Sequence, residues 1–399
     1  MKMRKRIDRI NSFGKLIVQL LCIAAYFVFS EFVLNFTIFK GVKTDFDYYR
    51  NMAFLPEEAE KAEKFMRDII SLGSRELSIP GTIIFNYNPA VRESFYFNSE
   101  GFRNDEFTKK EKDEFRIAIY GDSKIFGFAL QKEDTTPYIV EKMLREHFPG
   151  RNITVINMGV EGHDLQRAIA TAKYFHEKVD PDMVVFFSWI VDLYNTFEHG
   201  NVDWEPFVGG EILIPRTDGN SVMAPVDRFK LLKTLQHTYL VDTAKLTARI
   251  QGLSVANLPL SPEKMETAEN FPKSYLDRMK DATIYFERLG IPSLFILQPL
   301  IHTKKPLSGH EKYMIYLAEN VFPGMNIFSE KCISGVLEAL KTGKYGNNIV
   351  DHSNVFNDIQ DTVFFDGMHY TPRFARIEAE HIADELIKML EKGGYFENK

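Results

Sequence analysis

Three short apolar runs that alternate with amphipathic helical patterns restrict the fold of this chain more than any other feature. The runs lie at residues 117–120, 153–156 and 183–187. Each has the length of a buried strand, and the segments between them carry apolar residues at helical spacing. Strands connected through helices by short turns pair in parallel through right-handed crossovers. The pattern therefore predicts a parallel sheet with helices packed against it, and polar chemistry at the carboxyl ends of its strands.

The second half of the chain continues this alternation. A fourth buried strand is predicted at residues 293–297, and a last strand at residues 362–365. Apolar residues at helical spacing predict further helices around residues 275–289, 309–321, 329–340 and 372–390. We therefore expect an α/β domain that ends with the last of these helices.

An interruption separates the third strand from the fourth. Residues 205–215 resemble a hairpin with Gly209 and Gly210 at its turn, and residues 225–253 predict one or two helices. We expect an insert of about residues 200–272, placed where a lid or a specificity subdomain would lie. Plain decoration of the sheet edge is an equally good interpretation of this insert.

The N-terminus predicts a membrane anchor. Six basic residues and one acid lie within residues 1–15, and residues 16–39 are apolar apart from Gln19, Glu31 and a few small polar residues. A spanning helix needs about 20 predominantly apolar residues, and a basic flank stays in the cytoplasm. No small-residue cleavage pattern follows the apolar run, so we expect an uncleaved signal anchor that leaves the rest of the chain outside the cytoplasm.

These segments predict five parts of the chain. Residues 80–85 could form a strand in the second half of the stalk, and a solvated charge run at residues 109–114 marks its end. The parts are a basic cytoplasmic tail (1–15), a transmembrane signal anchor (16–39), a stalk and lead-in (40–114), the α/β domain (115–390) and a short tail (391–399).

Composition and charge argue against several classes of partner and cofactor. The net charge of −6 offers no basic field to nucleic-acid phosphates, so no nucleic-acid partner is expected. Two cysteines, Cys22 and Cys332, cannot build a disulfide framework or a cysteine metal site, and the ten histidines lack zinc-ligand spacing. A phosphate-binding or flavin-binding protein would need a glycine-rich loop that this sequence lacks. We expect no metal and no organic cofactor.

Ser123 follows the first predicted strand in the sequence Gly121-Asp122-Ser123, which would place its hydroxyl at the carboxyl edge of the sheet. A serine hydroxyl is a poor nucleophile at neutral pH and needs a base within about 3 Å that a third group holds in one tautomer. Asp366 and His369 follow the last predicted strand, and their spacing lets one turn of backbone bring carboxylate and imidazole together. Either motif alone is usually an ordinary turn, but their combination predicts a Ser-His-Asp triad.

Three segments resemble three of the four sequence blocks of the SGNH/GDSL hydrolases: Gly121-Asp122-Ser123, Asn157-Met-Gly-Val-Glu-Gly162 and Asp366-Gly-Met-His369. The resemblance covers about residues 97–390, with the insert set aside. It implies a flavodoxin-like three-layer α/β/α sandwich with a parallel sheet. It also implies acyl-ester chemistry through Ser123, His369 and Asp366, with the Ser123 and Gly162 backbone amides as oxyanion donors.

The N-terminal anchor, residues 98–103 and the insert look like those of membrane-anchored members of this superfamily. Some of those members work beside polytopic acyltransferases in modifying cell-surface polymers. The resemblance thus implies an acyl-ester substrate, a cell-surface glycan or lipid as its carrier, and a polytopic acyltransferase as partner.

Two positions depart from the superfamily's pattern. Val191 stands where the third block usually has an asparagine that donates to the oxyanion, and one such donor is worth on the order of 3 kcal/mol. Asn195, Asn157 or the indole N–H of Trp189 could substitute. Lys124 stands where an apolar residue is usual, and its cation could also favour a developing oxyanion. The sequence leaves these alternatives open.

Two functions of different classes fit these observations. The first is a membrane-tethered, extracytoplasmic serine esterase or acyltransferase. The second is a scaffold of the same fold that binds a glycan or a membrane acyltransferase partner with little chemistry. Val191 favours the scaffold, and the intact Ser123, His369 and Asp366 favour the enzyme.

Other polar residues are weaker candidates. Asp192 and Asp203 could form an acid pair for glycoside chemistry, although loop carboxylates are usually just solvated. His163 and His176 are equally well explained as helix-surface residues. The aromatic residues within 204–207 could stack on sugar rings.

Overall fold

The computed structural model describes most of the predicted α/β domain. The described residues are 58, 60–62, 64–65, 74–79, 82–87, 96–200 and 259–396. The predicted signal anchor at residues 16–39, the hairpin at 205–215 and the helices at 225–253 lie outside these ranges. Within the ranges, none of the helices combines the length and the apolarity that crossing a bilayer requires.

Five parallel strands form the central sheet in the order β4-β3-β5-β6-β7. They are β3 Glu114–Gly121, β4 Asn152–Gly159, β5 Met183–Ser188, β6 Ser293–Leu297 and β7 Ile349–Asp351. In chain order this is 2-1-3-4-5, the order of flavodoxin-like folds. The predicted parallel sheet is confirmed. The strand order reverses beside β3, so the β3 turn lies where such sheets bind their ligands.

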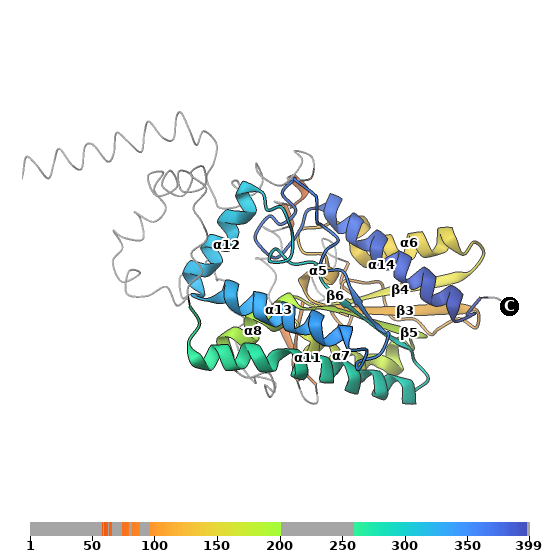
Figure 1. Cartoon of the computed structure of the whole chain (residues 1–399). Coiled ribbons are helices and arrows are strands. Elements are labelled where there is room, and N and C mark those ends of the chain that lie inside the picture. Colours follow the sequence, from red (N-terminus) through yellow and green to blue (C-terminus); the bar gives the residue numbers. More distant parts are fainter. Residues whose placement is uncertain are drawn as a thin grey trace, which may run out of the picture. The chain divides into compact units, whose positions relative to one another are not determined.

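Helices cover both faces of the sheet (Figure 1). One face packs against α6 Thr136–His147 and α14 Pro372–Lys392. The other face packs against α7 Leu165–Val179, α8 Ile190–His199, α11 Pro262–Arg288 and α13 Met325–Lys341. Three further helical segments are α5 Ser123–Phe126, the 3-10 turn η2 Lys132–Asp134 and α12 Gly309–Val321. The result is an α/β/α sandwich.

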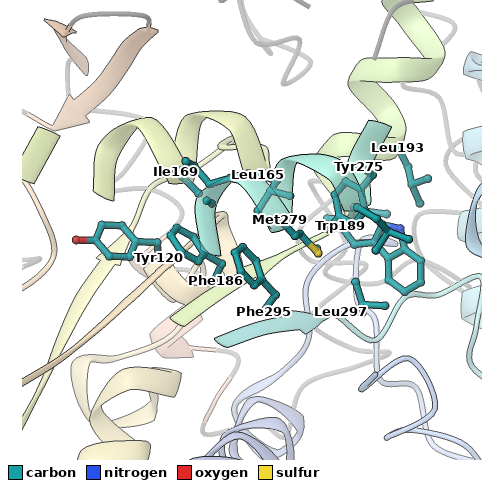
Figure 2. Packing of buried hydrophobic residues seen from close by; sticks show 14 of the residues in the cluster. Tyr120, Leu165, Ile169, Phe186, Trp189, Leu193, Tyr275, Met279, Phe295 and Leu297 are labelled. Atoms are coloured by element: carbon teal, nitrogen blue, oxygen red, sulfur yellow. The ribbon is translucent and has the colours of Figure 1, made fainter. Parts of the chain in front are cut away.

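The strands are buried on both faces, which explains their continuous apolar sequences. In β3, Ile117 faces the α6 and α14 layer, and Tyr120 faces the opposite layer. Tyr120, Phe186 and Phe295 are in register on neighbouring strands. Their rings stack with centroids 5.5 and 4.9 Å apart (Figure 2). This row of rings packs the centre of the sheet against α7 and α11.

The prediction of a last strand at residues 362–365 is wrong. In that segment Phe364 makes only an isolated antiparallel bridge with Tyr370. The fifth strand is β7, whose first two residues are partly buried and whose third is exposed. Because β7 lies at the edge of the sheet, it needs no continuous apolar run, and the apolar pattern could not detect it.

Two helices begin earlier than predicted. α11 starts at Pro262 rather than near residue 275, and α13 starts at Met325 rather than at residue 329. Pro272 lies inside α11, where proline normally interrupts a helix, so the pattern placed the start too late. The Pro272 ring packs closely against α13, where a Cβ on Gly335 would lie 2.5 Å from Pro272 Cγ.

The end of the predicted lead-in packs into the domain. Phe102 is buried in the same apolar cluster as α7. Arg103 donates from Nη1 to the carbonyl oxygen of Gly127 at 2.6 Å and from Nη2 to that of Leu130 at 2.7 Å. These bonds fix the segment that follows the Ser123 turn.

A short antiparallel hairpin precedes this segment. It consists of β1 Ser74–Ile79 and β2 Thr82–Tyr87. β2 includes most of the strand predicted at residues 80–85.

Candidate active site

The turn between β3 and α5 carries Ser123 at the carboxyl edge of the sheet. Asp122 caps α5, because its Oδ1 accepts a hydrogen bond from the amide of Lys124 at 2.9 Å. Ser123 is therefore the first helical residue. Gly121 lets the turn pack closely against β5, since a Cβ there would lie 2.5 Å from the carbonyl oxygen of Phe187.

The loop before α14 carries Asp366 and His369. Asp366 Oδ1 accepts hydrogen bonds from the amides of Met368 at 3.0 Å and His369 at 2.8 Å. Gly367 has a φ of 91°, a left-handed conformation that favours glycine. The amide of Phe365 donates to the carbonyl oxygen of His369 at 2.9 Å and closes the turn. The local backbone thus presents carboxylate and imidazole together.

Ser123, His369 and Asp366 lie in one hydrogen-bonded chain. The distance from Ser123 Oγ to His369 Nε2 is 2.6 Å, and that from His369 Nδ1 to Asp366 Oδ2 is 2.6 Å. When His369 is neutral, this network fits the tautomer in which Nδ1–H donates to the carboxylate and Nε2 accepts from the hydroxyl. Such a chain can remove a proton from Ser123 and stabilise the imidazolium that results.

The Asp366 carboxylate is suited to stabilising the positive charge of the His369 imidazolium. Burial alone would raise the pKa of Asp366, but the charge of His369 and the hydrogen bonds from His369 and Met368 outweigh it and hold the pKa below its usual range. The side chains of His369 and Asp366 are 13% and 25% exposed. Both side chains are therefore partly exposed to solvent, and the lowered pKa keeps the carboxylate ionised at neutral pH.

Two aromatic rings lie beside the imidazole, and the sequence analysis missed both. Phe128 stacks on His369 with ring centroids 4.4 Å apart and an angle of 28° between the planes. Phe365 lies at 5.9 Å with an angle of 27°. Nothing in the sequence marks Phe128 among the many phenylalanines, because its contact with His369 joins residues far apart in the chain.

Lys124 does not extend into the solvent beside the nucleophile. Its side chain is buried, and Nζ donates to Gln298 Oε1 and to the carbonyl oxygen of Pro299, both at 3.1 Å. Burial lowers the pKa of Lys124 to about 8, against the opposing pull of Asp122, Glu378 and Asp366. The idea that this cation acts directly on an oxyanion finds no support in these contacts.

The two asparagines considered as oxyanion donors use different side-chain atoms in their hydrogen bonds. Asn157 Oδ1 accepts from the amide of Gly159 at 3.0 Å at the carboxyl end of β4, a bond that uses the side-chain oxygen and not its N–H donors. Asn195 Nδ2 donates to Asp164 Oδ2 at 3.1 Å. Asp164 caps α7, so the Asn195 side chain braces the start of that helix.

The remaining oxyanion candidates have different surroundings. Gly162 lies in the loop between β4 and α7 with a φ of 70°, which favours glycine. Trp189 is fully buried among core side chains (Figure 2), and its Nε1 has no hydrogen-bond partner within the described ranges. Val191 packs against the same apolar cluster. The backbone amides of Ser123 and Gly162 remain the donors that the sequence blocks imply.

Asp192, one member of the acid pair considered for glycoside chemistry, is buried. Asp192 accepts hydrogen bonds from Ser188 Oγ at 2.5 Å and from the amide of Leu165 at 3.1 Å, and burial followed by the charge of Asp164 raises its pKa to about 7. Asp192 therefore supports α7 from within the core. Asp203, its proposed acid partner, and residues 204–207 lie outside the described residues.

His163 and His176, the two histidines considered in the sequence, have different surroundings. His163 is buried rather than on a helix surface, and burial followed by the charge of Arg167 lowers its pKa to about 3. His176 lies on α7, where its Nδ1 is 2.7 Å from the carbonyl oxygen of Lys173. No group of three or more His, Cys, Asp and Glu side chains in the part of the chain that the structure describes is arranged to hold a metal ion.

No protein-family model and no curated protein matches the chain. Several solved structures are similar to it. A putative lipolytic protein of the G-D-S-L family from Desulfitobacterium hafniense is 12% identical with a TM-score of 0.31, over 67% of this chain and 98% of that one. A putative acylhydrolase from Bacteroides fragilis is 10% identical with a TM-score of 0.36, over 71% and 92%. An acetylxylan esterase from Geobacillus stearothermophilus is 13% identical with a TM-score of 0.33, over 69% and 96%.

Identities and TM-scores this low establish neither an activity nor a substrate for this chain. Its own features carry more weight. The sheet has the expected order, and Ser123, His369 and Asp366 meet at the carboxyl edge of β3. In its sequence blocks, its strand order and the geometry of these three residues, the chain has the fold of the SGNH/GDSL hydrolases.

Proposed function

We propose that this protein is a serine esterase or acyltransferase that acts on acyl esters through an acyl-enzyme on Ser123. The observation that carries the proposal is the continuous hydrogen-bonded chain from Ser123 Oγ through His369 to Asp366. An imidazole at 2.6 Å from the hydroxyl is within reach to act as general base. The carboxylate on the other ring nitrogen is the group that such a base needs.

The first half-reaction forms the acyl-enzyme. Ser123 Oγ attacks the acyl carbon while its proton passes to His369 Nε2, and the carbonyl electron pair moves onto oxygen. When the tetrahedral intermediate collapses, the alcohol leaves with the proton from His369. An acyl ester then remains on Ser123.

The second half-reaction decides between hydrolysis and transfer. Water or an acceptor hydroxyl attacks the acyl carbon and gives its proton to His369. Ser123 Oγ then leaves with that proton, which restores the enzyme. Asp366 stabilises the imidazolium in both halves and does not itself take the proton.

Two backbone amides would stabilise the oxyanion. Ser123 is the first residue of α5, so its N–H has no acceptor within its own helix. Gly162, on the neighbouring β4 loop, supplies the second donor. The Val191 side chain supplies no donor, so we expect a slower enzyme than one with a third, side-chain donor, by roughly a hundred- to a thousandfold.

The wider assignment rests on the sequence. We propose that residues 16–39 anchor the chain and that the domain acts outside the cytoplasm on acyl esters of a cell-surface glycan or lipid, beside a polytopic acyltransferase. The basic flank and the apolar run support the anchor.

Labelling with a fluorophosphonate probe tests the central proposal. We expect the full-length protein to be labelled and Ser123→Ala to remain unlabelled. Ser334→Ala, which removes an exposed hydroxyl from α13, is the matched control and should be labelled like the wild type. Failure to label the folded wild type would contradict the enzyme and favour a binding scaffold.

A further inference from the structure

The two residues that flank Ser123 belong to a closed ring of buried hydrogen bonds. The amide of Lys124 donates to Asp122 Oδ1 at 2.9 Å, and Lys124 Nζ donates to Gln298 Oε1 at 3.1 Å. Gln298 Nε2 completes the ring by donating to Asp122 Oδ2 at 2.7 Å. Asp122 and Gln298 are fully buried, and Lys124 is 3% exposed. The backbone of Ser123 is therefore held from both sides.

The ring also connects the carboxyl ends of three adjacent strands. Asp122 follows β3 and Gln298 follows β6. Gln298 Nε2 lies 3.2 Å from the carbonyl oxygen of Phe187, near the end of β5. Lys124 Nζ donates to the carbonyl oxygen of Pro299. The turn that carries Ser123 is thus tied to the ends of the interior strands of the sheet.

The same ammonium group touches the loop that carries the base. Lys124 Nζ lies 5.3 Å from the ring centroid of Tyr370 and 5.8 Å from that of Phe364. These two rings are paired across the turn that contains Asp366 and His369. A cation over two aromatic rings is attracted to both. Lys124 therefore contacts the nucleophile turn and the base loop at once.

We propose that Lys124 is a positioning residue that holds the Ser123 hydroxyl within hydrogen-bonding distance of the His369 imidazole. It does so as a cation. The inference rests on the proposed function and adds to it a requirement for this particular side chain. The neutral lysine would lose its attraction to the two rings and would leave Asp122 as an uncompensated buried charge.

The surroundings of the ammonium make its charge sensitive to pH. Burial lowers the pKa of Lys124 to about 8, while three carboxyl groups favour the cation: Asp122 from its own turn, Glu378 from α14 and Asp366 from the base loop. The hydroxyl of Tyr370, whose pKa burial raises well above the usual range, stays neutral. We therefore expect the hydrogen bond between Ser123 and His369 to weaken above about pH 8 while the fold persists.

The test compares Lys124→Met with the wild type in the full-length chain. The rate of fluorophosphonate labelling is measured from about pH 6 to about pH 10. We expect Lys124→Met to react at least about tenfold more slowly at neutral pH, and the wild-type rate to fall above about pH 8. The variant should lack this alkaline fall. Lys142→Met, which removes an exposed lysine of α6, should match the wild type.

A Lys124→Met protein that labels at the wild-type rate with the same pH profile would overturn the proposal. If that variant does not fold, the wild type decides, because a flat rate between about pH 8 and pH 10 would also overturn it. A crystal structure of Lys124→Met gives a readout independent of reactivity. A Ser123 Oγ to His369 Nε2 distance beyond about 3.5 Å supports the proposal, and an unchanged distance overturns it. If the wild type is not labelled at all, the enzyme assignment fails, while this structural comparison still tests the role of Lys124.

Discussion

Phe128 lies almost parallel to the imidazole of His369, with ring centroids 4.4 Å apart. The backbone around Phe128 is unusual, because Gly127 has a φ of 86° and Ala129 a φ of 61°. A left-handed alanine costs on the order of 1 kcal/mol. Phe65 supports the Phe128 ring from another side, with centroids 5.8 Å apart. The ring restricts rotation of the imidazole and offers its face to an imidazolium.

Removing this ring should impair turnover more than binding. We expect Phe128→Ala to lower kcat for a nitrophenyl ester roughly ten- to hundredfold, because His369 would lose the surface that holds its orientation. Phe128→Tyr, which keeps an aromatic face, should retain most of the activity. Steady-state kinetics give kcat and KM separately. An unchanged kcat in Phe128→Ala would show that the stacking has no catalytic role.

Asp366 should be needed for the tautomer rather than for the fold. Asp366→Asn keeps an oxygen that can accept from the amides of Met368 and His369, but its amide side can no longer accept from His369 Nδ1. We expect kcat to fall by about 10³- to 10⁴-fold with little change in melting temperature. Asp361→Asn, an exposed partner of Arg373 just before this loop, is the matched control. A loss of less than about tenfold would argue against the triad.

A buried ion pair stabilises the start of the loop that carries Asp366 and His369. Lys304 Nζ and Glu311 Oε2 lie 2.8 Å apart and are almost fully buried, and Glu311 Oε1 accepts from the amides of Val363 and Phe364. Glu311→Gln would leave the lysine as an uncompensated buried charge. We expect the free energy of unfolding to fall by about 3 kcal/mol or more, as measured by denaturant titration.

Glu380→Gln is the control for that experiment, since Glu380 pairs with Arg376 on the exposed face of α14. Its effect should stay within about 0.5 kcal/mol. Equal effects of the two substitutions would show that the buried pair does not stabilise the fold.

Asp192 should make stability depend on pH in the opposite sense to a salt-bridged carboxylate. Burial and the charge of Asp164 raise its pKa from 3.8 to about 7, so the folded chain binds this proton more tightly than the unfolded chain. Stability from this group is present below about pH 4 and is lost as the pH rises to about 7. Asp192→Asn should therefore gain stability relative to the wild type over that range, by up to about 4 kcal/mol.

Denaturant titrations of Asp192→Asn and the wild type at about pH 4 and about pH 8 measure this difference. Asp281→Asn, an exposed position on α11, should show no such trend. A difference between Asp192→Asn and the wild type that does not change with pH would contradict a raised pKa in the folded state.

The sequence was most informative where structure depends on local pattern. β3, β4, β5 and β6 could be predicted because strands buried on both faces require continuous apolar runs. β7 could not, because an edge strand of three partly exposed residues has no such requirement. The start of α11 was missed because Pro272 lies inside the helix, where a proline usually marks a boundary. For β7 and for the start of α11, the structure depends on tertiary packing, which the local sequence pattern does not show.

The same distinction between local motifs and long-range contacts applies to the residues of the site. Ser123, Asp366 and His369 could be predicted because each belongs to a short motif at a strand end or in a tight turn. Phe128 and Gln298 could not, since their roles arise from contacts with residues far away in the chain. The direction of the Lys124 side chain was equally hidden, because a lysine beside a nucleophile reads the same whether it faces solvent or the interior.

Val191 offers the most direct test of what limits the chemistry. It is the second residue of α8 and packs partly against the core, and its side chain has no group that can donate a hydrogen bond. If the oxyanion has only the Ser123 and Gly162 amides, an added amide donor should stabilise the transition state more than the bound substrate. We expect Val191→Asn to raise kcat at least about tenfold, and to lower stability by about 1 kcal/mol through lost apolar contact. Val191→Leu, which adds no donor, should not raise kcat, and an equal or lower kcat in Val191→Asn would mean that this position does not face the oxyanion.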